Sequence, residues 1–267
     1  MSVINTNITA LIGQNNLSNS QAMLSKAQER LSSGLRINSA SDDAAGQAIA
    51  NRMSAQITGM QQAQRNTNDG ISLAQTMEGG LNQISDNLQR IRELAVQAAN
   101  DTNTSADRSS IALEIQERID EIDRVSEATT FNGTALLSGT VATLNIQVGA
   151  NIEDADSIEV DTFDASSAAL GVSALSVGAF ASAQTAIDAI DTALQDIDDQ
   201  RATLGATLNR FDSVLENLNT NITNLSEARS RIQDADYAVE VSNLTRAQIL
   251  QQAGTSMLAQ ANQTPQP

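Results

Sequence analysis

Between Ile187 and Ile232, apolar side chains recur every three or four residues with few interruptions. The stripe consists of Ile187, Ile190, Leu194, Ile197, Leu204, Leu208, Phe211, Leu215, Leu218, Ile222, Leu225 and Ile232. A stripe with this period faces a partner helix along its whole length, which predicts a coiled-coil seam. At 1.5 Å per residue, the helix would be roughly 70 Å long. Arg201 and Arg229 interrupt the stripe, and either their stems reach the edge of the seam or they pair with acids across the interface and fix its register.

The composition favours long helices over a wide core. Aromatic residues make up 2% of the chain and tryptophan is absent, so Leu, Ile, Ala and Met must supply the core. Side chains of this kind suit narrow seams between helices. The net charge of −17 opposes binding to nucleic acid or to an anionic membrane surface. The sequence therefore predicts a mainly α, elongated protein without nucleic-acid or membrane partners.

The first half of the chain predicts three helical segments. Residues 1–40 are amphipathic, and Ser41 to Asp43 then form a strong helix start. The long helix expected there carries a second seam, which comprises Met77, Leu81, Ile84, Leu88, Ile91, Ala95 and Ala98. Gly70 within it indicates either a close backbone approach or a break. Isoleucines from Ile111 to Ile122, followed by Val125, predict a shorter returning helix.

The middle of the chain has a different pattern. Asn132-Gly133 is typical of a hairpin turn, and Leu144, Ile146 and Val148 alternate with polar residues as in a half-buried strand. The alternation resumes at Ile158 and Val160. We therefore expect a small β-hairpin segment at the tip of the helical rod.

Together these patterns predict a long antiparallel coiled-coil hairpin with paired N- and C-terminal helices. The expected divisions are an N-terminal inner helix over 1–40, rod helices over 41–130, the β-rich tip over 131–185, the returning rod helix over 186–232, and a C-terminal inner helix over 233–267. The residues assigned to the rod seam are Leu81, Ile84, Leu88, Ile91, Leu204, Leu208, Phe211, Leu215 and Leu218. The terminal pair has no third element to cover it, so we expect it to become ordered only on self-association.

The residues needed for common catalytic and metal sites are missing. Histidine and cysteine are absent, which removes the usual general base, the commonest metal ligand and the thiol nucleophile. The acidic run Asp154 to Asp161 lacks the turn glycine and closing glutamate of an EF-hand. Lys26 is the only lysine, and we see no orienting partner for it nearby in the sequence. The sequence predicts neither an enzyme nor a cofactor.

Several motifs resemble bacterial flagellin in flagellin order. The strongest is the run from Leu31 to Arg52, LSSGLRINSASDDAAGQAIANR. Others are LQRIRELAVQ from Leu88, EIDRVS from Glu121, FNG from Phe131, and EVSNLTRAQILQQAGT from Glu240. The matches cover residues 1–135 and 185–264, and the short middle leaves no room for large outer domains.

This resemblance implies a structural subunit that self-polymerises into the flagellar filament for motility and is extracellular. It implies export in unfolded form through the flagellar type III channel, which agrees with a first segment unlike a cleaved secretory signal. The implied partners are further copies of the chain, the filament cap and hook-junction proteins, and a cytosolic export chaperone on the C-terminal helix. The residues expected in the inner core of the polymer are Ile4, Ile8, Leu11, Leu24, Leu31, Leu244, Leu250 and Met257.

The resemblance also implies recognition by the host Toll-like receptor that senses flagellin. The positions that match the family's epitope are Gln89, Arg90, Leu94 and Glu114. The alternative is that these are ordinary rod-surface residues.

Three rival functions explain part of the pattern. A hook-filament junction protein resembles flagellin at both ends, but the run 31–52 favours a filament subunit. An enzyme carried on a filament is disfavoured by the missing histidine and the short insert. A soluble coiled-coil adaptor explains the stripe but not the paired terminal helices.

Overall fold

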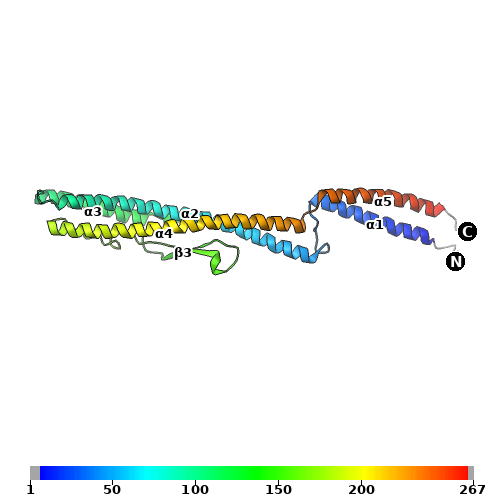
Figure 1. Cartoon of the computed structure of the whole chain (residues 1–267), viewed down its shortest axis with the longest axis horizontal. Helices are drawn as coiled ribbons and strands as arrows, with labels where there is room; N and C mark the ends of the chain where they lie inside the picture. The colour runs from blue at the N-terminus through cyan, green and yellow to red at the C-terminus, as the bar shows by residue number, and fades with distance from the viewer. Residues whose placement is uncertain (1–6, 264–267) are drawn as a thin grey trace. The chain divides into compact units, whose positions relative to one another are not determined.

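The computed structural model describes residues 7–263, which form five long helices and four short strands. The helices are α1 (Ile8–Ser33), α2 (Ala44–Ala98), α3 (Ser105–Ala128), α4 (Phe180–Gln233) and α5 (Tyr237–Gln263) (Figure 1). The strands are β1 (Thr130–Phe131), β2 (Thr134–Ala135), β3 (Thr143–Gln147) and β4 (Ser157–Asp161), with the short 3-10 helix η1 (Asp154–Asp156) before β4. The mainly α prediction is confirmed.

The chain divides into two compact units. The central unit is Thr58–Ile222, and the terminal unit contains the residues up to Ile57 and from Thr223 onward. Helices α2 and α4 each contribute residues to both units. Each unit is described below by itself.

In the central unit, α2 and α4 run antiparallel in a register marked by three contacts. The Arg92 guanidinium donates to both carboxylate oxygens of Asp191, Gln64 donates to Asn219, and the Phe211 ring lies against Gly70. Residues 77–98 therefore face the first part of α4, and residues from Leu204 onward face the earlier part of α2. One contiguous core includes Leu81, Ile84, Leu88, Ile91, Leu204 and Phe211. Leu218 is also buried, while Leu208 and Leu215 are half-buried.

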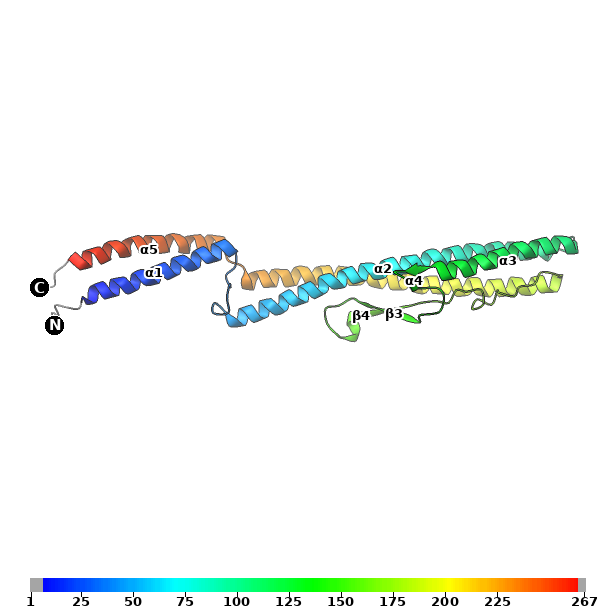
Figure 2. The same cartoon turned by 180° about the vertical axis from the view of Figure 1, so that it is seen from behind.

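Helix α3 adds a third layer to this core (Figure 2). Its N-terminus is fixed by a capping box, in which Thr104 accepts from the Asp107 N–H and Asp107 accepts from the Thr104 N–H. The apolar stripe of α3 packs in the same core as the α2–α4 seam. Its buried residues are Ile111, Ile115, Ile119, Ile122 and Val125. Arg108 Nε donates to the Ala98 carbonyl oxygen and so ties the start of α3 to the end of α2.

Gly70 lies inside an unbroken α2, so of the two alternatives the close approach is the correct one. A β-carbon built on Gly70 would be 2.9 Å from Phe211 Cζ and 3.3 Å from Ile146 Cγ1. The glycine is needed for packing, because the Phe211 ring occupies the space that a larger side chain would fill.

The strands form two antiparallel pairs, β1 with β2 and β3 with β4. Asn132 and Gly133 both have positive φ, 50° and 79°, which is the geometry of the predicted tight turn. In the second pair Leu144 lies opposite Val160, and Ile146 lies opposite Ile158. Both predicted strand signals are therefore confirmed.

The position of the strand segment differs from the prediction. The β3–β4 pair lies along the helices and not at their end: Asn66 Nδ2 donates to the Gln147 carbonyl oxygen, and Ala150 packs against Gly59 (Figure 2). The apolar face of the strands explains this, because Ile158 and Val160 are buried in the helical core. Beyond β4 the chain is anchored to α3, where Asp123 accepts from both the N–H and the hydroxyl of Ser167.

In the terminal unit, α1 and α5 pair in antiparallel fashion. Asn7 caps α1 and also donates through Nδ2 to the Ala261 carbonyl oxygen, 3.0 Å away. Helix α1 ends earlier than residue 40, because Gly34 adopts φ 72° as a left-handed C-cap. The chain then passes beside the α4–α5 connection: Ala235 N donates to the Gly34 carbonyl oxygen, and Arg36 N donates to that of Gln233.

Candidate assembly surfaces

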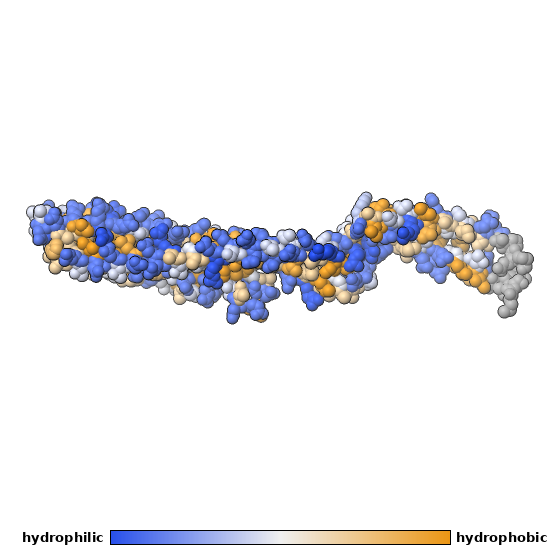
Figure 3. Space-filling model, in the orientation of Figure 1, coloured by the Kyte–Doolittle hydropathy of each residue, from blue (hydrophilic) through white to orange (hydrophobic). Residues whose placement is uncertain are grey.

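The two terminal helices bury very few side chains. Only Ser20 and Ala27 of α1 and Glu240 and Ala247 of α5 are buried among the residues described. The residues predicted for the inner core fall into two groups: Leu24, Leu31 and Leu244 are half-buried, whereas Ile8, Leu11, Leu250 and Met257 are exposed. Ile4 lies outside the described residues. The terminal helices therefore present apolar side chains on their outer surface (Figure 3).

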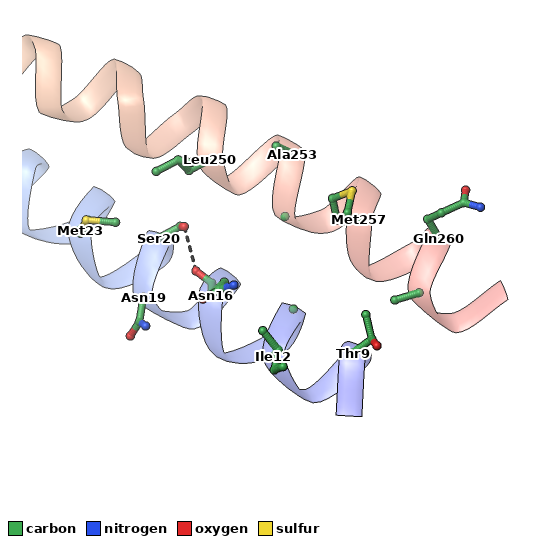
Figure 4. Close-up of a pocket in the computed structure, with 13 residues that line it drawn as sticks. Thr9, Ile12, Asn16, Asn19, Ser20, Met23, Leu250, Ala253, Met257 and Gln260 are labelled. Atoms are coloured by element: carbon green, nitrogen blue, oxygen red, sulfur yellow. Dashed lines mark hydrogen bonds between the residues drawn. The ribbon is translucent and has the colours of Figure 1, made fainter. Parts of the chain in front are cut away.

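A groove of about 610 Å³ lies between α1 and α5. Its walls carry Ile12 and Met23 from α1, and Leu250, Ala253 and Met257 from α5 (Figure 4). Polar residues also line it, among them Asn16 and Ser20, whose hydroxyl donates to the Asn16 carbonyl oxygen at 2.9 Å. Two glycines let the helices approach closely: a β-carbon built on Gly254 would lie 3.3 Å from Leu17 Cδ1, and one built on Gly13 would lie 3.5 Å from Leu258 Cδ1.

A buried ion pair joins the two helices near their other end. Arg30 Nη1 lies 3.0 Å from Glu240 Oε1, and the Glu240 side chain is almost fully buried. The hydrophobic pattern does not predict this pair, because Arg30 and Glu240 are far apart along the chain. One signal was available: Glu240 falls on the same face of α5 as Leu244 and Ala247, and a lone acid on an apolar face needs a cation opposite.

Lys26 also has partners, contrary to the expectation from the sequence. Its Nζ lies 3.1 Å from Glu29 Oε2 and 2.6 Å from Asp42 Oδ1. Asp42 Oδ2 accepts from the backbone N–H groups of Asn38 and Ser39. The hydrogen bond from Lys26, together with these backbone donors, holds the pKa of Asp42 well below its usual range, and the pKa of Lys26 is raised by the same bond. The pair ties α1 to the segment that follows it.

The positions predicted as a receptor epitope lie on α2 and α3 in the central unit. Arg90 Nε donates to Glu114 Oε1 at 3.0 Å, and Arg90 Nη1 donates to Glu93 at 2.9 Å. These bonds raise the pKa of Arg90, with the Glu93 bond as the larger cause. Gln89 is exposed beside them, whereas Leu94 is 2% exposed and belongs to the helical core. The surface at this site therefore consists of Gln89, Arg90 and Glu114, and the Leu94 side chain supports them from below.

The two arginines in the stripe of α4 are half-buried. Arg201 Nη1 lies 3.8 Å from Asp198 on its own helix, and Arg229 donates to the Ser54 hydroxyl at 3.2 Å. These contacts agree with stems that reach the edge of the seam.

The described residues contain no group of three or more acids that could hold a metal ion. None of the described helices is long and apolar enough to cross a membrane.

Comparisons with known proteins match both helical parts of the chain. The family model for the bacterial flagellin N-terminal helical region matches residues 4–142, and the model for the C-terminal helical region matches residues 187–267. The chain is 51% identical to a flagellin of Xenorhabdus nematophila, over 99% of this chain and 97% of the relative. It is 45% identical to a flagellin of Halalkalibacterium halodurans, with the same coverage of both chains.

A solved structure agrees with these relatives. The crystal structure of Bacillus cereus flagellin superposes with a TM-score of 0.52 at 38% identity, and the match covers 62% of this chain and 94% of that one. Flagellins are structural proteins that self-assemble into the extracellular filament, so the expected non-enzymatic role is confirmed by the family. On its sequence and its fold, this chain belongs to the bacterial flagellin family and is a structural subunit of the flagellar filament.

Proposed function

We propose that the exposed apolar faces of α1 and α5 are the surfaces through which subunits join in the filament. The observation that carries this proposal is the exposure of large apolar side chains in the terminal pair, such as Ile8 at 59% and Met257 at 66%. Contiguous apolar patches of this kind mark interaction sites on soluble proteins. The central unit, by contrast, buries its own stripe. The inner-core residues are then Ile8, Leu11, Leu24, Leu31, Leu244, Leu250 and Met257.

A charge placed in the groove tests this assignment. Leu250→Asp puts a carboxylate where a neighbouring subunit would cover it, and burial of an unpaired charge is strongly unfavourable. Leu250 is 41% exposed in the monomer, so the same substitution should lower the free energy of unfolding of the monomer by only about 1 to 2 kcal/mol, which leaves the monomer folded. Ile152→Asp is the matched control, since Ile152 is exposed on the strand segment, outside the terminal helices.

The assay is seeded polymerisation followed by sedimentation. Wild type and Ile152→Asp should pellet as filaments, and Leu250→Asp should stay in the supernatant as a folded monomer with unchanged circular dichroism. Normal filaments of Leu250→Asp would show that the groove is not an assembly surface.

The same surface gives a reason for the proposed chaperone. Before export through the flagellar type III channel, the exposed apolar side chains of α5 need to be covered in the cytosol. Besides Leu250, they include Val239 and Ile249. We place the export chaperone on this helix, and the cap and hook-junction proteins at the ends of the polymer. Ile249→Asp should weaken copurification of the chaperone, whereas Ile8→Asp on α1 should leave it unchanged. Equal loss in both variants would argue against a site on α5.

Recognition by the Toll-like receptor is proposed for the surface of Gln89, Arg90 and Glu114. The Arg90 side chain is held by Glu114 and Glu93 on the outside of α2 and α3, so a rigid charged group is presented to a partner. Arg92→Ala is the control, because Arg92 pairs with Asp191 of α4. In a reporter-cell assay with soluble monomer, Arg90→Ala should lower the response and Arg92→Ala should not. Equal activity of Arg90→Ala and wild type would exclude this surface.

A further inference from the structure

The methionines of the chain differ sharply in exposure. Met60 and Met77 are buried in the described structure, at 8% and 0%, and Met53 is half-buried. Met23 is 49% exposed and Met257 is 66% exposed. Met1 lies outside the described residues. Because oxidation of a thioether depends on access to its sulfur, Met23 and Met257 are the positions that an oxidant in solution reaches first.

Both of these methionines line the groove between the terminal helices. Met23 comes from α1 and Met257 from α5, and Figure 4 shows them on either side of the space that Leu250 also borders. The two most exposed methionines among the described residues, although far apart in sequence, therefore lie on the same groove.

We propose that Met23 and Met257 form an oxidation-sensitive site that controls entry of the subunit into the filament. The oxidant is a hydroperoxide, with hydrogen peroxide as the simplest case. A sulfur lone pair attacks one peroxide oxygen, the O–O bond breaks and an S–O bond forms. The sulfur loses two electrons to become a sulfoxide. The transferred oxygen gives up its proton to the departing hydroxide, so hydrogen peroxide is reduced to water. This inference rests on the proposed role of the groove as an assembly surface.

The sulfoxide changes the chemistry of the groove wall. A thioether is apolar and deformable, whereas a sulfoxide oxygen is a strong acceptor that loses its water when a neighbouring subunit covers it. Leu250, Ala253 and Ile12 on the wall have no side-chain donor, and the Ser20 hydroxyl already donates to the Asn16 carbonyl oxygen, whereas Thr9, Asn16 and Asn19 place donors elsewhere in the groove lining. A sulfoxide buried against these apolar side chains, away from the donors, is an unpaired acceptor and should raise the critical concentration for assembly about tenfold. In assembled filaments the same sulfurs are covered, so oxidation there should be slower.

The test treats folded monomer with hydrogen peroxide and locates sulfoxides by peptide mass spectrometry. Met23→Leu/Met257→Leu keeps the volume and apolar character of both side chains. Met53→Leu/Met60→Leu is the matched control, with two methionines removed outside the groove. After oxidation, wild type and the control should show the higher critical concentration, and Met23→Leu/Met257→Leu should assemble as before. Treatment with methionine sulfoxide reductases of both epimer specificities should restore assembly of wild type.

A second measurement needs no variant. When partly oxidised wild type is polymerised, subunits recovered from filaments should be depleted in Met23 and Met257 sulfoxides relative to the supernatant, with no depletion at Met53. Equal sulfoxide content in both fractions would overturn the proposal. So would a Met23→Leu/Met257→Leu protein that loses assembly on oxidation as wild type does. If Leu250→Asp blocks assembly while the oxidised protein still assembles, only this inference fails; if both assemble, the proposed assembly surface fails with it.

Discussion

Gly79 and Gly80 are neighbours in α2, but a methyl group added to each would meet different surroundings. At Gly79 a β-carbon would have nothing within 4 Å. At Gly80 it would lie 2.7 Å from Leu137 Cδ1, 2.7 Å from Thr129 Oγ1 and 3.0 Å from Thr129 Cγ2. Both substitutions replace glycine by alanine in the interior of the same helix, so the change in helix propensity is the same. Any difference in stability between the two variants therefore comes from packing.

The expected magnitudes follow from two terms. Gly→Ala in a helix interior contributes about 0.5 to 1 kcal/mol of stability, because alanine loses less backbone entropy on folding. Gly79→Ala should therefore raise the free energy of unfolding by about that amount, or the melting temperature by roughly 2 to 4 °C per kcal/mol. Gly80→Ala has the same favourable contribution from helix propensity. Its added methyl group, however, would clash with the fully buried Leu137, and overpacking of this kind typically costs about 1 to 3 kcal/mol.

The propensity term is common to both variants, so their free energies of unfolding should differ by about 1 to 3 kcal/mol. The assay is unfolding of the monomer in guanidinium, monitored by circular dichroism at helical wavelengths. The dependence of the free energy of unfolding on denaturant concentration should be the same for both variants. If Gly80→Ala is as stable as Gly79→Ala, the close packing of Thr129 and Leu137 on α2 is wrong.

Three further predictions concern the fold. Phe211→Ala should lower the free energy of unfolding by about 3 to 5 kcal/mol in guanidinium denaturation, since the ring is fully buried; a loss below about 1 kcal/mol would contradict this. Thr104→Ala should cost about 1 kcal/mol in the same assay, because it removes the cap of α3; no change would argue against the capping box. The pKa of Asp42 is lowered by folding, so its contribution to stability is present above its ordinary value of 3.8 and is lost as the pH falls below that value. The melting temperature of wild type should therefore exceed that of Asp42→Asn at pH 7, and the gap should narrow at about pH 3; a gap that widens in acid would contradict this sign.

The helices and strands of this chain were predictable because their signals are local. The stripe of α4 has the period of a helix that is buried on one face, and Asn132-Gly133 specifies a turn through backbone geometry alone. Gly34 was not recognised as the end of α1, although a glycine after an amphipathic run is a common stop signal. The conformation at this residue, and not the hydrophobic pattern, ends the helix.

Contacts between residues that are distant in sequence were much harder to predict. The strand segment was expected at the tip because it lies between helices in sequence, yet Ile146 packs on Gly70 in the middle of α2. Leu94 matched the epitope pattern by position, but its side chain faces the core that α2, α3 and α4 form together. Both features depend on which face of one element meets another, which a single sequence does not specify.

Order in the terminal helices is the most direct test of the central claim that these surfaces are completed by neighbouring subunits. Because α1 and α5 bury so few side chains, their local stability in the monomer should be low. Hydrogen exchange measured by mass spectrometry on monomer and on filaments tests this for each helix separately. We expect α1 and α5 to exchange rapidly in the monomer and slowly in the filament, with the buried seam of α2 and α4 protected in both. Equal protection of α1 and α5 in the two states would contradict the account.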